Sequence, residues 1–281
     1  MSTELRHITL RGQNLAYLEE GDGPLVLLLH GFPDSARSFD GLRAGLVQAG
    51  YRTVAPWLRG YHPTGPVADG DYSVAALAGD VVAFMEALAP GEKTRLIGHD
   101  WGGFAATAAA ALAPQHVERL VVLGVPHMHV INFSLSQIRR SWYVWLFQLP
   151  LLAERLLPRD DFAFIDGLYR RWSPRLDPDR VNLRAVKEAL GGPGSTAAAI
   201  AYYRSLMRGH RRSWRLLRQK TTVPSLWFAG GQDGSLDPGQ FRGIEGAFDD
   251  AFELVMLEEA GHFMHLEEPE TILENILGFF P

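Results

Sequence analysis

Strand-like and helix-like segments alternate along most of this chain, and that alternation most narrows the folds available to it. Up to about residue 127, apolar β-rich runs such as PLVLLLH (24–30) and TRLIGHD (94–100) are followed by helical runs. Strand–helix–strand units build a mostly parallel sheet with helices on its faces. Two earlier β-rich runs, HITL and LAYLEE, predict an antiparallel pair that precedes it. The sequence therefore predicts an α/β fold.

The strand signal disappears between about residues 128 and 216 and then returns. The interrupted stretch is rich in Trp, Arg and Leu, has helix-like spacing and is broken by prolines. Afterwards come the strand-like VPSLWFAGG and FELVMLEEAG, a predicted helix at 237–248 and a terminal helix. We expect a core of residues 1–127 and 217–281, with a mostly parallel eight-stranded sheet flanked by helices. Residues 128–216 would form an inserted helical cap.

One turn in the core carries an unexpected residue. LIGHDWGGFA (96–105) runs from an apolar strand through a glycine-flanked turn into an alanine-rich helix. A G-x-S-x-G turn in this context presents the nucleophilic serine of α/β-hydrolases. Here the central residue is Asp100, which we therefore expect to be a nucleophile rather than a simple turn residue.

Polar residues follow four of the predicted strands. They lie in HGFPD (30–34), GHDWGG (98–103), GGQDG (230–234) and AGHFMH (260–265). Ligands of open α/β sheets bind beyond the carboxyl ends of the strands, so these segments should meet. Their order matches the oxyanion loop, nucleophile, acid and base of the α/β-hydrolase fold.

The acid and the base each have a neighbouring rival. His262 follows its strand within AGH and is the expected base, whereas His265 lies one helical turn further on and suits packing or capping. Asp233 directly follows FAGG and is the expected acid. Asp237 precedes a proline and resembles the N-cap of the next helix.

A carboxylate nucleophile points to a particular reaction. Asp100, with an ordinary pKa of about 3.9, is ionised at neutral pH without help from a base. It suits attack on an sp³ carbon that bears a leaving group or belongs to a strained ring, and the product is an enzyme ester. His262, oriented by Asp233, can then activate water against that ester. Backbone N–H groups of Phe32 and Trp101 are the expected oxyanion hole.

These motifs resemble those of the α/β-hydrolase-fold epoxide hydrolases over nearly the whole chain, from HGFPDS through RGY (59–61) and GHDWGG to AGHFMHLEEPE. The resemblance implies two cap tyrosines whose hydroxyls hold the epoxide oxygen. The family pattern Y-x-x-x-F-Q matches YVWLFQ and points to Tyr143. The pattern P-G-x-T-A followed by W-Y-R matches PGSTAAAIAYYR and points to Tyr203. Tyr169 and Tyr202 are expected to be packing residues.

A tyrosine hydroxyl beside the epoxide oxygen would assist opening of the ring. Opening of an epoxide produces an alkoxide, and a phenol with a pKa of about 10 remains protonated to donate to it. The chain departs from the common family wording at Trp57, at His62 and at Tyr202, which stands before Tyr203 in place of a tryptophan. These changes remove no expected catalytic group and bear on the shape of the pocket.

Two other functions stay open. Haloalkane and haloacid dehalogenases use the same Asp–His–Asp chemistry. The former commonly have an asparagine where this chain has Phe32, and fluoroacetate dehalogenases have arginines where it has Trp101 and Phe104. A tryptophan indole N–H can nevertheless bind halide. A binding protein that keeps the fold without turnover is the third possibility, although no expected catalytic group is missing.

Composition limits the partners. A net charge of −5 gives no long-range attraction to nucleic acid or anionic lipid. The first residues lack the order of a signal peptide, and no apolar run is long enough to span a bilayer. No cysteine, metal motif or dinucleotide fingerprint is present. We expect a cytoplasmic protein that takes a small apolar epoxide and water, uses no cofactor or metal, and forms a homodimer if the aromatic cap provides an interface.

Overall fold

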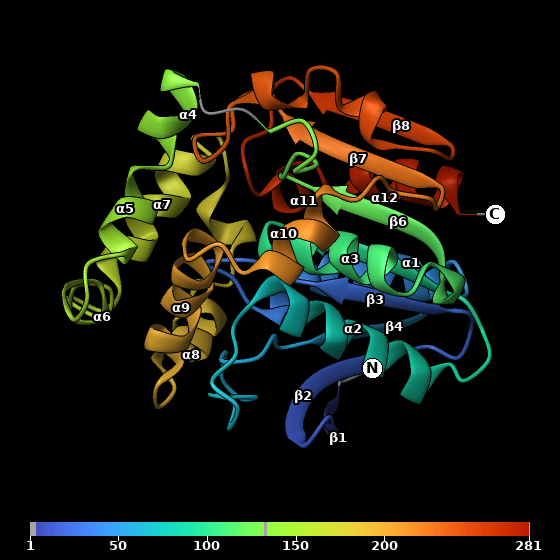
Figure 1. The fold of residues 1–281 in the computed structure, drawn as a ribbon, viewed down its shortest axis with the longest axis horizontal. Helices are drawn as coiled ribbons and strands as arrows, with labels where there is room; N and C mark the ends of the chain where they lie inside the picture. Colours follow the sequence, from blue (N-terminus) through green and yellow to red (C-terminus); the bar gives the residue numbers. More distant parts are fainter. Residues whose placement is uncertain (1–3, 132–133, 281) are drawn as a thin grey trace.

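The computed structural model describes residues 4–131 and 134–280. The ends of the predicted core (residues 1–3 and 281) and residues 132–133 of the predicted cap lie outside the described residues. The centre of the fold is an eight-stranded sheet with the order β1-β2-β4-β3-β5-β6-β7-β8 (Figure 1). Its strands are β1 (Glu4–Leu10), β2 (Gln13–Glu20), β3 (Leu25–Leu29), β4 (Arg52–Pro56), β5 (Thr94–His99), β6 (Val117–Leu123), β7 (Ser225–Gly230) and β8 (Phe252–Leu257).

The sheet is mostly parallel, as the alternation predicts. Only β1 with β2 and β2 with β4 pair in antiparallel fashion, whereas all pairs from β4 to β8 are parallel. Every residue of β3, β5 and β7 is buried. Such continuous burial means that helices cover both faces of the sheet. The predicted fold class is confirmed.

The core helices form two layers. They are α1 (Asp40–Gln48), α2 (Val74–Leu88), α3 (Trp101–Leu112), α11 (Met264–Glu267) and α12 (Pro269–Phe279). The chain moves in opposite directions across the sheet from β3 to β4 and from β4 to β5. Since crossovers between parallel strands are right-handed as a rule, this change of direction puts α1 and α2 on opposite faces. Helix α3 packs beside α2, and α12 packs beside α1.

Between β6 and β7 the described chain is helical. It contains α4 (Leu135–Arg140), α5 (Trp142–Phe147), α6 (Leu152–Leu156), α7 (Ala163–Trp172), α8 (Leu183–Gly191), α9 (Ser195–Met207) and α10 (Arg211–Arg218). Helices α4 to α9 lie to the left of the sheet in Figure 1, whereas α10 lies over α3. These helices occupy the stretch for which the sequence predicts a helical insertion, and the division into core and cap stays a prediction.

One helix prediction is wrong. The structure has no α-helix at 237–248, where two short 3₁₀ turns, Pro238–Phe241 and Ile244–Ala247, stand instead. Gly243 between them has φ 74°, outside the helical region. Three glycines in this segment raise the free energy of a continuous helix, and the left-handed residue ends it.

None of the helices in the described ranges combines the length and apolar character that crossing a membrane requires.

Candidate active site

Asp100 occupies a sharp turn between β5 and α3. Its backbone angles are φ 50° and ψ −117°, which residues with a side chain rarely adopt. Two glycines allow the turn to form. A Cβ atom on Gly98 would collide with the carbonyl group of Gly102, and one on Gly102 would collide with the carbonyl group of Leu29. The strained turn presents the Asp100 side chain beyond the end of β5, as a nucleophile elbow does.

The loop after β3 holds the Asp100 carboxylate. The N–H of Phe32 donates a hydrogen bond to Oδ1 across 2.8 Å. Gly31 lies so close that a Cβ atom there would overlap the Asp100 side chain. Trp101 is the first residue of α3, so its N–H is among the amides that have no partner within the helix. Both predicted oxyanion donors therefore belong to segments that flank the carboxylate.

His262 lies between Asp100 and Asp233. Its Nδ1 and Asp233 Oδ2 are 2.8 Å apart, and its Nε2 and Asp100 Oδ2 are 3.7 Å apart. The first distance is a hydrogen bond and the second is too long for one. Asp233 Oδ1 accepts from the N–H groups of Ser235 and Leu236. The sequence-predicted nucleophile, base and acid are thus brought together, and His262 Nε2 is left buried without a hydrogen-bond partner.

Two opposing influences act on the His262 ring. Burial by itself would lower the pKa of His262, but the charge of Asp233, the hydrogen bond to Asp233 and the nearby charge of Asp100 outweigh it and raise the pKa to about 10. The imidazole is therefore held protonated between two carboxylates at neutral pH. Loss of either negative charge would lower this pKa.

Tyr143 on α5 and Tyr203 on α9 approach the same space from the helical stretch. Their ring centroids are 5.7 Å apart, and both side chains are buried. The Tyr143 hydroxyl and Ser235 Oγ are 3.1 Å apart, whereas the Tyr203 hydroxyl has no hydrogen-bond partner among the described residues. Burial, and then neighbouring charge or ionisable groups including Asp100, raise the pKa of both phenols, so both stay protonated at neutral pH.

Aromatic rings surround the phenols. The Tyr203 ring contacts Phe32, Trp101 and Phe147, with centroid distances of 5.0 to 5.4 Å. The space above Asp100 is therefore lined by apolar rings and two hydroxyl groups. Such a lining suits an uncharged reacting group of low polarity.

Sequence reasoning missed how the acid segment 233–235 is held by the helices. Gln137 on α4 donates from Nε2 to the Ser235 carbonyl oxygen and accepts from the Asp237 N–H. Arg140 donates to the Asp233 carbonyl oxygen. The only local sign of this role in the sequence is that Ser235 stands two residues after the predicted acid, Asp233. Gln137 and Arg140 lie about a hundred residues before their partners in the sequence, and no sequence pattern links residues so far apart.

Trp172 at the end of α7 was also missed. Its carbonyl oxygen accepts from the N–H groups of His262, across 2.9 Å, and Gly234, across 3.1 Å. Its ring lies 5.3 Å from the ring of His262 and 4.8 Å from that of Tyr143. One residue thus supports the base, the acid segment and a phenol together. A tryptophan in a Trp-rich helical stretch gives no signal of this role.

The four residues that the sequence analysis set aside in favour of the predicted site residues all make structural contacts. His265 packs against the Phe39 ring, and Asp237 accepts from the Gly239 N–H at the start of a 3₁₀ turn. The hydroxyl of Tyr169 donates to the Pro33 carbonyl oxygen, and that of Tyr202 donates to a backbone carbonyl of the RGY segment.

A buried polar cluster lies behind the base. Among the described residues, Asp34, His99 and His265 form the one group whose ligand atoms could hold a metal ion, and these atoms lie within 4.8 Å of one another. His99 Nε2–H donates to the His262 carbonyl oxygen. Burial lowers the pKa of His99 and His265 and raises that of Asp34 to about 7. The two imidazoles are therefore neutral at physiological pH, and His99 fixes the backbone of the base.

Comparison with known proteins gives three concordant results. The family model described as alpha/beta hydrolase fold matches residues 24–269. The chain is 32% identical to the AB hydrolase superfamily protein YfhM of Bacillus subtilis (strain 168), over 92% of this chain and 90% of that protein. It is 31% identical to Epoxide hydrolase 3 of Mus musculus, over 95% of this chain and 74% of that protein. The crystal structure of an epoxide hydrolase from Bacillus megaterium with an inhibitor is similar with a TM-score of 0.84 and 25% identity, covering 98% of this chain and 99% of that one.

Proposed function

The chain belongs to the α/β-hydrolase fold family and, within it, to the epoxide hydrolases, and from that premise we propose that it converts an epoxide to a vicinal diol through an ester on Asp100. One observation carries the proposal. The carboxylate at the elbow faces a His262–Asp233 pair on one side, and two buried protonated phenols stand over the same space. A serine at this position would form an ether with the same carbon, which the site could not hydrolyse.

The first half-reaction forms the ester. Asp100 Oδ2 attacks a ring carbon, the bond from that carbon to the epoxide oxygen breaks, and the oxygen receives a hydrogen bond and then a proton from Tyr143 or Tyr203. Proton donation by a positioned side chain typically contributes about 10²- to 10⁴-fold in rate. The unpartnered hydroxyl of Tyr203 supports this role, because it is a donor with nothing yet to donate to.

The second half-reaction consumes water. His262 Nε2 takes a proton from water, and the hydroxide adds to Cγ of Asp100. The negative charge develops on Oδ1, to which the Phe32 N–H already donates, and the Trp101 N–H is the second donor. Collapse breaks the Cγ–Oδ2 bond, His262 protonates the departing diol oxygen, and the acid formed at Asp100 returns its proton to the tyrosinate. No cofactor or metal enters this balance.

The raised pKa of His262 fits the order of these steps. Before reaction, two carboxylates hold the ring protonated. Formation of the ester neutralises Asp100, so the pKa of His262 falls and the ring releases its proton to solvent and can act as a base. It takes up a proton again when ester hydrolysis restores the Asp100 carboxylate. The base therefore becomes available only after the nucleophile has reacted.

We also propose the division into a core, 1–127 and 217–281, and a cap, 128–216, that acts as a lid. Tyr143 and Tyr203 come from this cap, and every catalytic group is less than a tenth exposed. A substrate therefore needs the cap to move before it reaches Asp100.

We also propose an oligomeric state, a substrate class and a cellular location for the protein. Large apolar side chains are exposed between residues 135 and 152, among them Leu135 on α4, Trp145 on α5 and Leu151 just before α6, at 81%, 55% and 63%. This apolar surface supports a homodimer, which sedimentation of the wild type beside Trp145→Arg would test. The aromatic lining supports a small apolar epoxide as substrate, and cell fractionation would test the proposed cytoplasmic location.

The deciding experiment is the intact mass of the His262→Gln variant after incubation with aryl epoxides, alkyl epoxides and haloalkanes. Epoxide opening expels nothing, so we expect a gain equal to the whole epoxide mass, mapped by peptide analysis to Asp100. Asp100→Ala is the matched control and should gain nothing. A gain of an alkyl group without halogen would instead identify a dehalogenase. No adduct with any compound, together with no turnover by the wild type, would favour a binding protein.

A further inference from the structure

The side chains of Glu267 and Ser173 hold the chain on both sides of the base. Glu267 Oε2 accepts from the N–H of Gly261, directly before His262, across 2.8 Å. Ser173 Oγ accepts from the N–H of Phe263, directly after His262, across 2.9 Å. The Ser173 hydroxyl donates in turn to Glu267 Oε2, across 2.8 Å. One linked pair of side chains therefore binds the two amides that flank the base.

The end of α7 also holds the base itself. The His262 N–H donates to the carbonyl oxygen of Trp172, the residue before Ser173. Gly261 lies so close to this end of the helix that a Cβ atom there would collide with Ser173 Cα and the Trp172 carbonyl oxygen. Three consecutive amides, those of residues 261–263, are therefore bound, which restricts rotation of the backbone at His262.

The position of this backbone decides where the imidazole stands. Nδ1 of His262 bonds to Asp233, and Nε2 lies 3.7 Å from Asp100 Oδ2. A general base has to come within about 2.6 to 3.2 Å of the water that it activates, and a misplacement of about 1 Å can cost about 10²-fold in rate. Attack by the Asp100 carboxylate on an epoxide needs no base. Displacement of His262 should therefore slow hydrolysis of the ester and spare its formation.

We propose that Glu267 and Ser173 are positioning residues for His262, needed for hydrolysis of the ester on Asp100 and not for its formation. This inference rests on the proposed function, because both half-reactions belong to it. The two groups that donate to Glu267 Oε2 are neutral, an amide and a hydroxyl. The site therefore requires a hydrogen-bond acceptor at this point, and a neutral acceptor can replace the carboxylate.

The first test uses Ser173→Ala and Glu267→Ala. Intact mass after rapid mixing with an epoxide follows the ester on the enzyme and gives its rates of formation and decay. We expect formation near the wild-type rate and decay slowed by about tenfold or more, so that the ester accumulates. Formation and decay slowed by the same factor, or a smaller active fraction with unchanged rates, would indicate a structural role alone and would overturn the proposal.

Glu267→Gln separates positioning from stability. The glutamine amide oxygen can accept the two hydrogen bonds that Oε2 accepts, so we expect decay of the ester near the wild-type rate. The NH₂ group takes the place of Oε1, which is buried without a hydrogen-bond partner among the described residues, so the midpoint of urea unfolding should fall. Decay as slow as in Glu267→Ala would contradict the requirement for an acceptor alone and would overturn the proposal.

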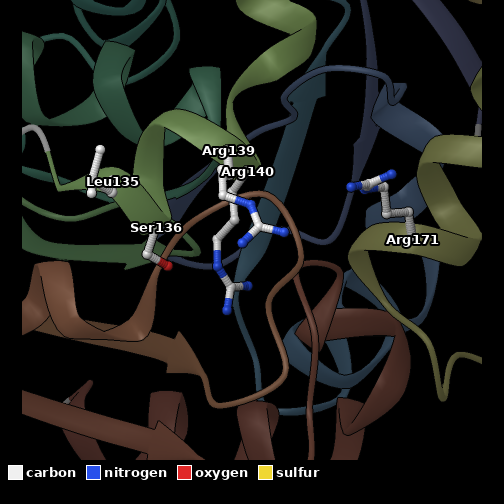
Figure 2. A pocket seen from close by; sticks show the side chains of 5 residues that line it. All are labelled: Leu135, Ser136, Arg139, Arg140 and Arg171. Atoms are coloured by element: carbon white, nitrogen blue, oxygen red, sulfur yellow. The ribbon is translucent and has the colours of Figure 1, made fainter.

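Two nearby substitutions are matched controls. Arg171 precedes Ser173 by two residues, but its side chain extends from α7 into a pocket of about 430 Å³ that two arginines of α4 also line (Figure 2). Glu268 directly follows Glu267, and the hydrogen bonds that bind residues 261–263 come from other groups. Arg171→Gln and Glu268→Ala should leave decay of the ester unchanged. Decay slowed as much as in Ser173→Ala would mean that any change nearby has this effect and would overturn the proposal.

A measurement on the free protein separates this inference from the proposed reaction. The proton between His262 Nδ1 and Asp233 should give a low-field NMR resonance in the wild type, since the two atoms are 2.8 Å apart. We expect the resonance to be lost through faster exchange with water in Ser173→Ala and Glu267→Ala, and to persist in Glu267→Gln. That result would support the positioning role even if no epoxide formed an ester, in which case the proposed function alone would fail. An unchanged resonance in all three variants would overturn the positioning role.

Discussion

A carboxylate in place of a hydroxyl at residue 100 changes what the neighbouring histidine has to do. A serine needs its histidine before the attack, whereas a carboxylate needs no base to become a nucleophile, and the Asp100 carboxylate lies 3.7 Å from His262. In the proposed reaction the histidine becomes a base after the ester forms. The proposed chemistry thus follows from the type of residue at position 100.

Asp100→Asn should lower the pKa of His262. The amide cannot supply the negative charge that helps to raise this pKa to about 10, although its oxygen can still accept from the Phe32 N–H. Asp233→Asn should lower the pKa further, because the charge of Asp233 is the larger of the two raising influences. The measurement is an NMR titration of the labelled His262 ring in the three proteins. An unchanged pKa in Asp100→Asn would show that the two side chains are not coupled.

Tyr203→Phe should separate activity from stability. Its hydroxyl is buried without a partner, so its removal should not destabilise the protein and can raise the free energy of unfolding by up to about 1 kcal/mol. Epoxide turnover should fall by about 10²-fold or more, because the variant loses a proton donor. Denaturant unfolding and single-turnover kinetics give the two values.

Tyr202→Phe is the matched control for that change. The Tyr202 hydroxyl donates to the Arg59 carbonyl oxygen, so its loss should cost about 1 kcal/mol of stability and leave turnover near the wild-type rate. If the two variants behaved in the opposite way, Tyr202 and not Tyr203 would be the phenol of the reaction.

At the scale of helices and strands, the glycines of the elbow admit no side chain. Gly102→Ala would press a methyl group against the carbonyl groups of Leu29 and His30, which are backbone and cannot rotate away. We expect a loss of about 1 to 3 kcal/mol in unfolding free energy, with reduced ester formation.

Gly167→Ala in the middle of α7 provides the contrast. Nothing lies within 4 Å of a Cβ atom there, and the backbone is already helical, so we expect a gain of about 1 kcal/mol. Urea unfolding of both variants measures the difference. Equal effects would mean that close packing does not set the shape of the elbow.

The fold could be predicted from the sequence wherever a local residue pattern determines the secondary structure. Alternating apolar runs identify the strands, and G-x-D-x-G between a strand and a helix identifies the elbow at Asp100. The prediction failed at 237–248, where a helix was expected but Gly243 turns the chain into the left-handed region. It was silent on Gln137, Arg140 and Trp172, because their partners are distant in sequence and are set by packing of the helices between β6 and β7 against the loops after β7 and β8.

At the scale of the whole molecule, buried histidines should govern stability toward acid. Burial lowers the pKa of His30 and His127 to about 4, that of His265 to about 3 and that of His99 well below 6.5. Between those values and 6.5 the unfolded chain binds more protons, so stability should fall as the pH drops below 6.5. Asp34, whose pKa burial raises to about 7, opposes this trend as a single group.

His262 should govern how the stability of the protein changes above neutral pH. Its raised pKa gives a stabilisation that is complete below pH 6.5 and is lost as the pH rises toward about 10. Calorimetric melting temperatures across pH should therefore peak at roughly pH 6 to 7. In His262→Gln the decline above that range should be shallower. The decline on the acid side should also become weaker, because the charge of His262 helps to lower the pKa of His99 and His265. An alkaline decline as steep as that of the wild type would assign it to other groups.

The acid segment 233–235 is supported at once by the core and by α4 and α5. Gln137, Arg140 and Tyr143 all contact it, so displacement of these helices would remove three contacts from the segment that carries the Asp233 carboxylate. The state of the protein that admits substrate and the state that activates water would then exclude each other. An enzyme built in this way is least able to activate water at the moment when bulk solvent can enter.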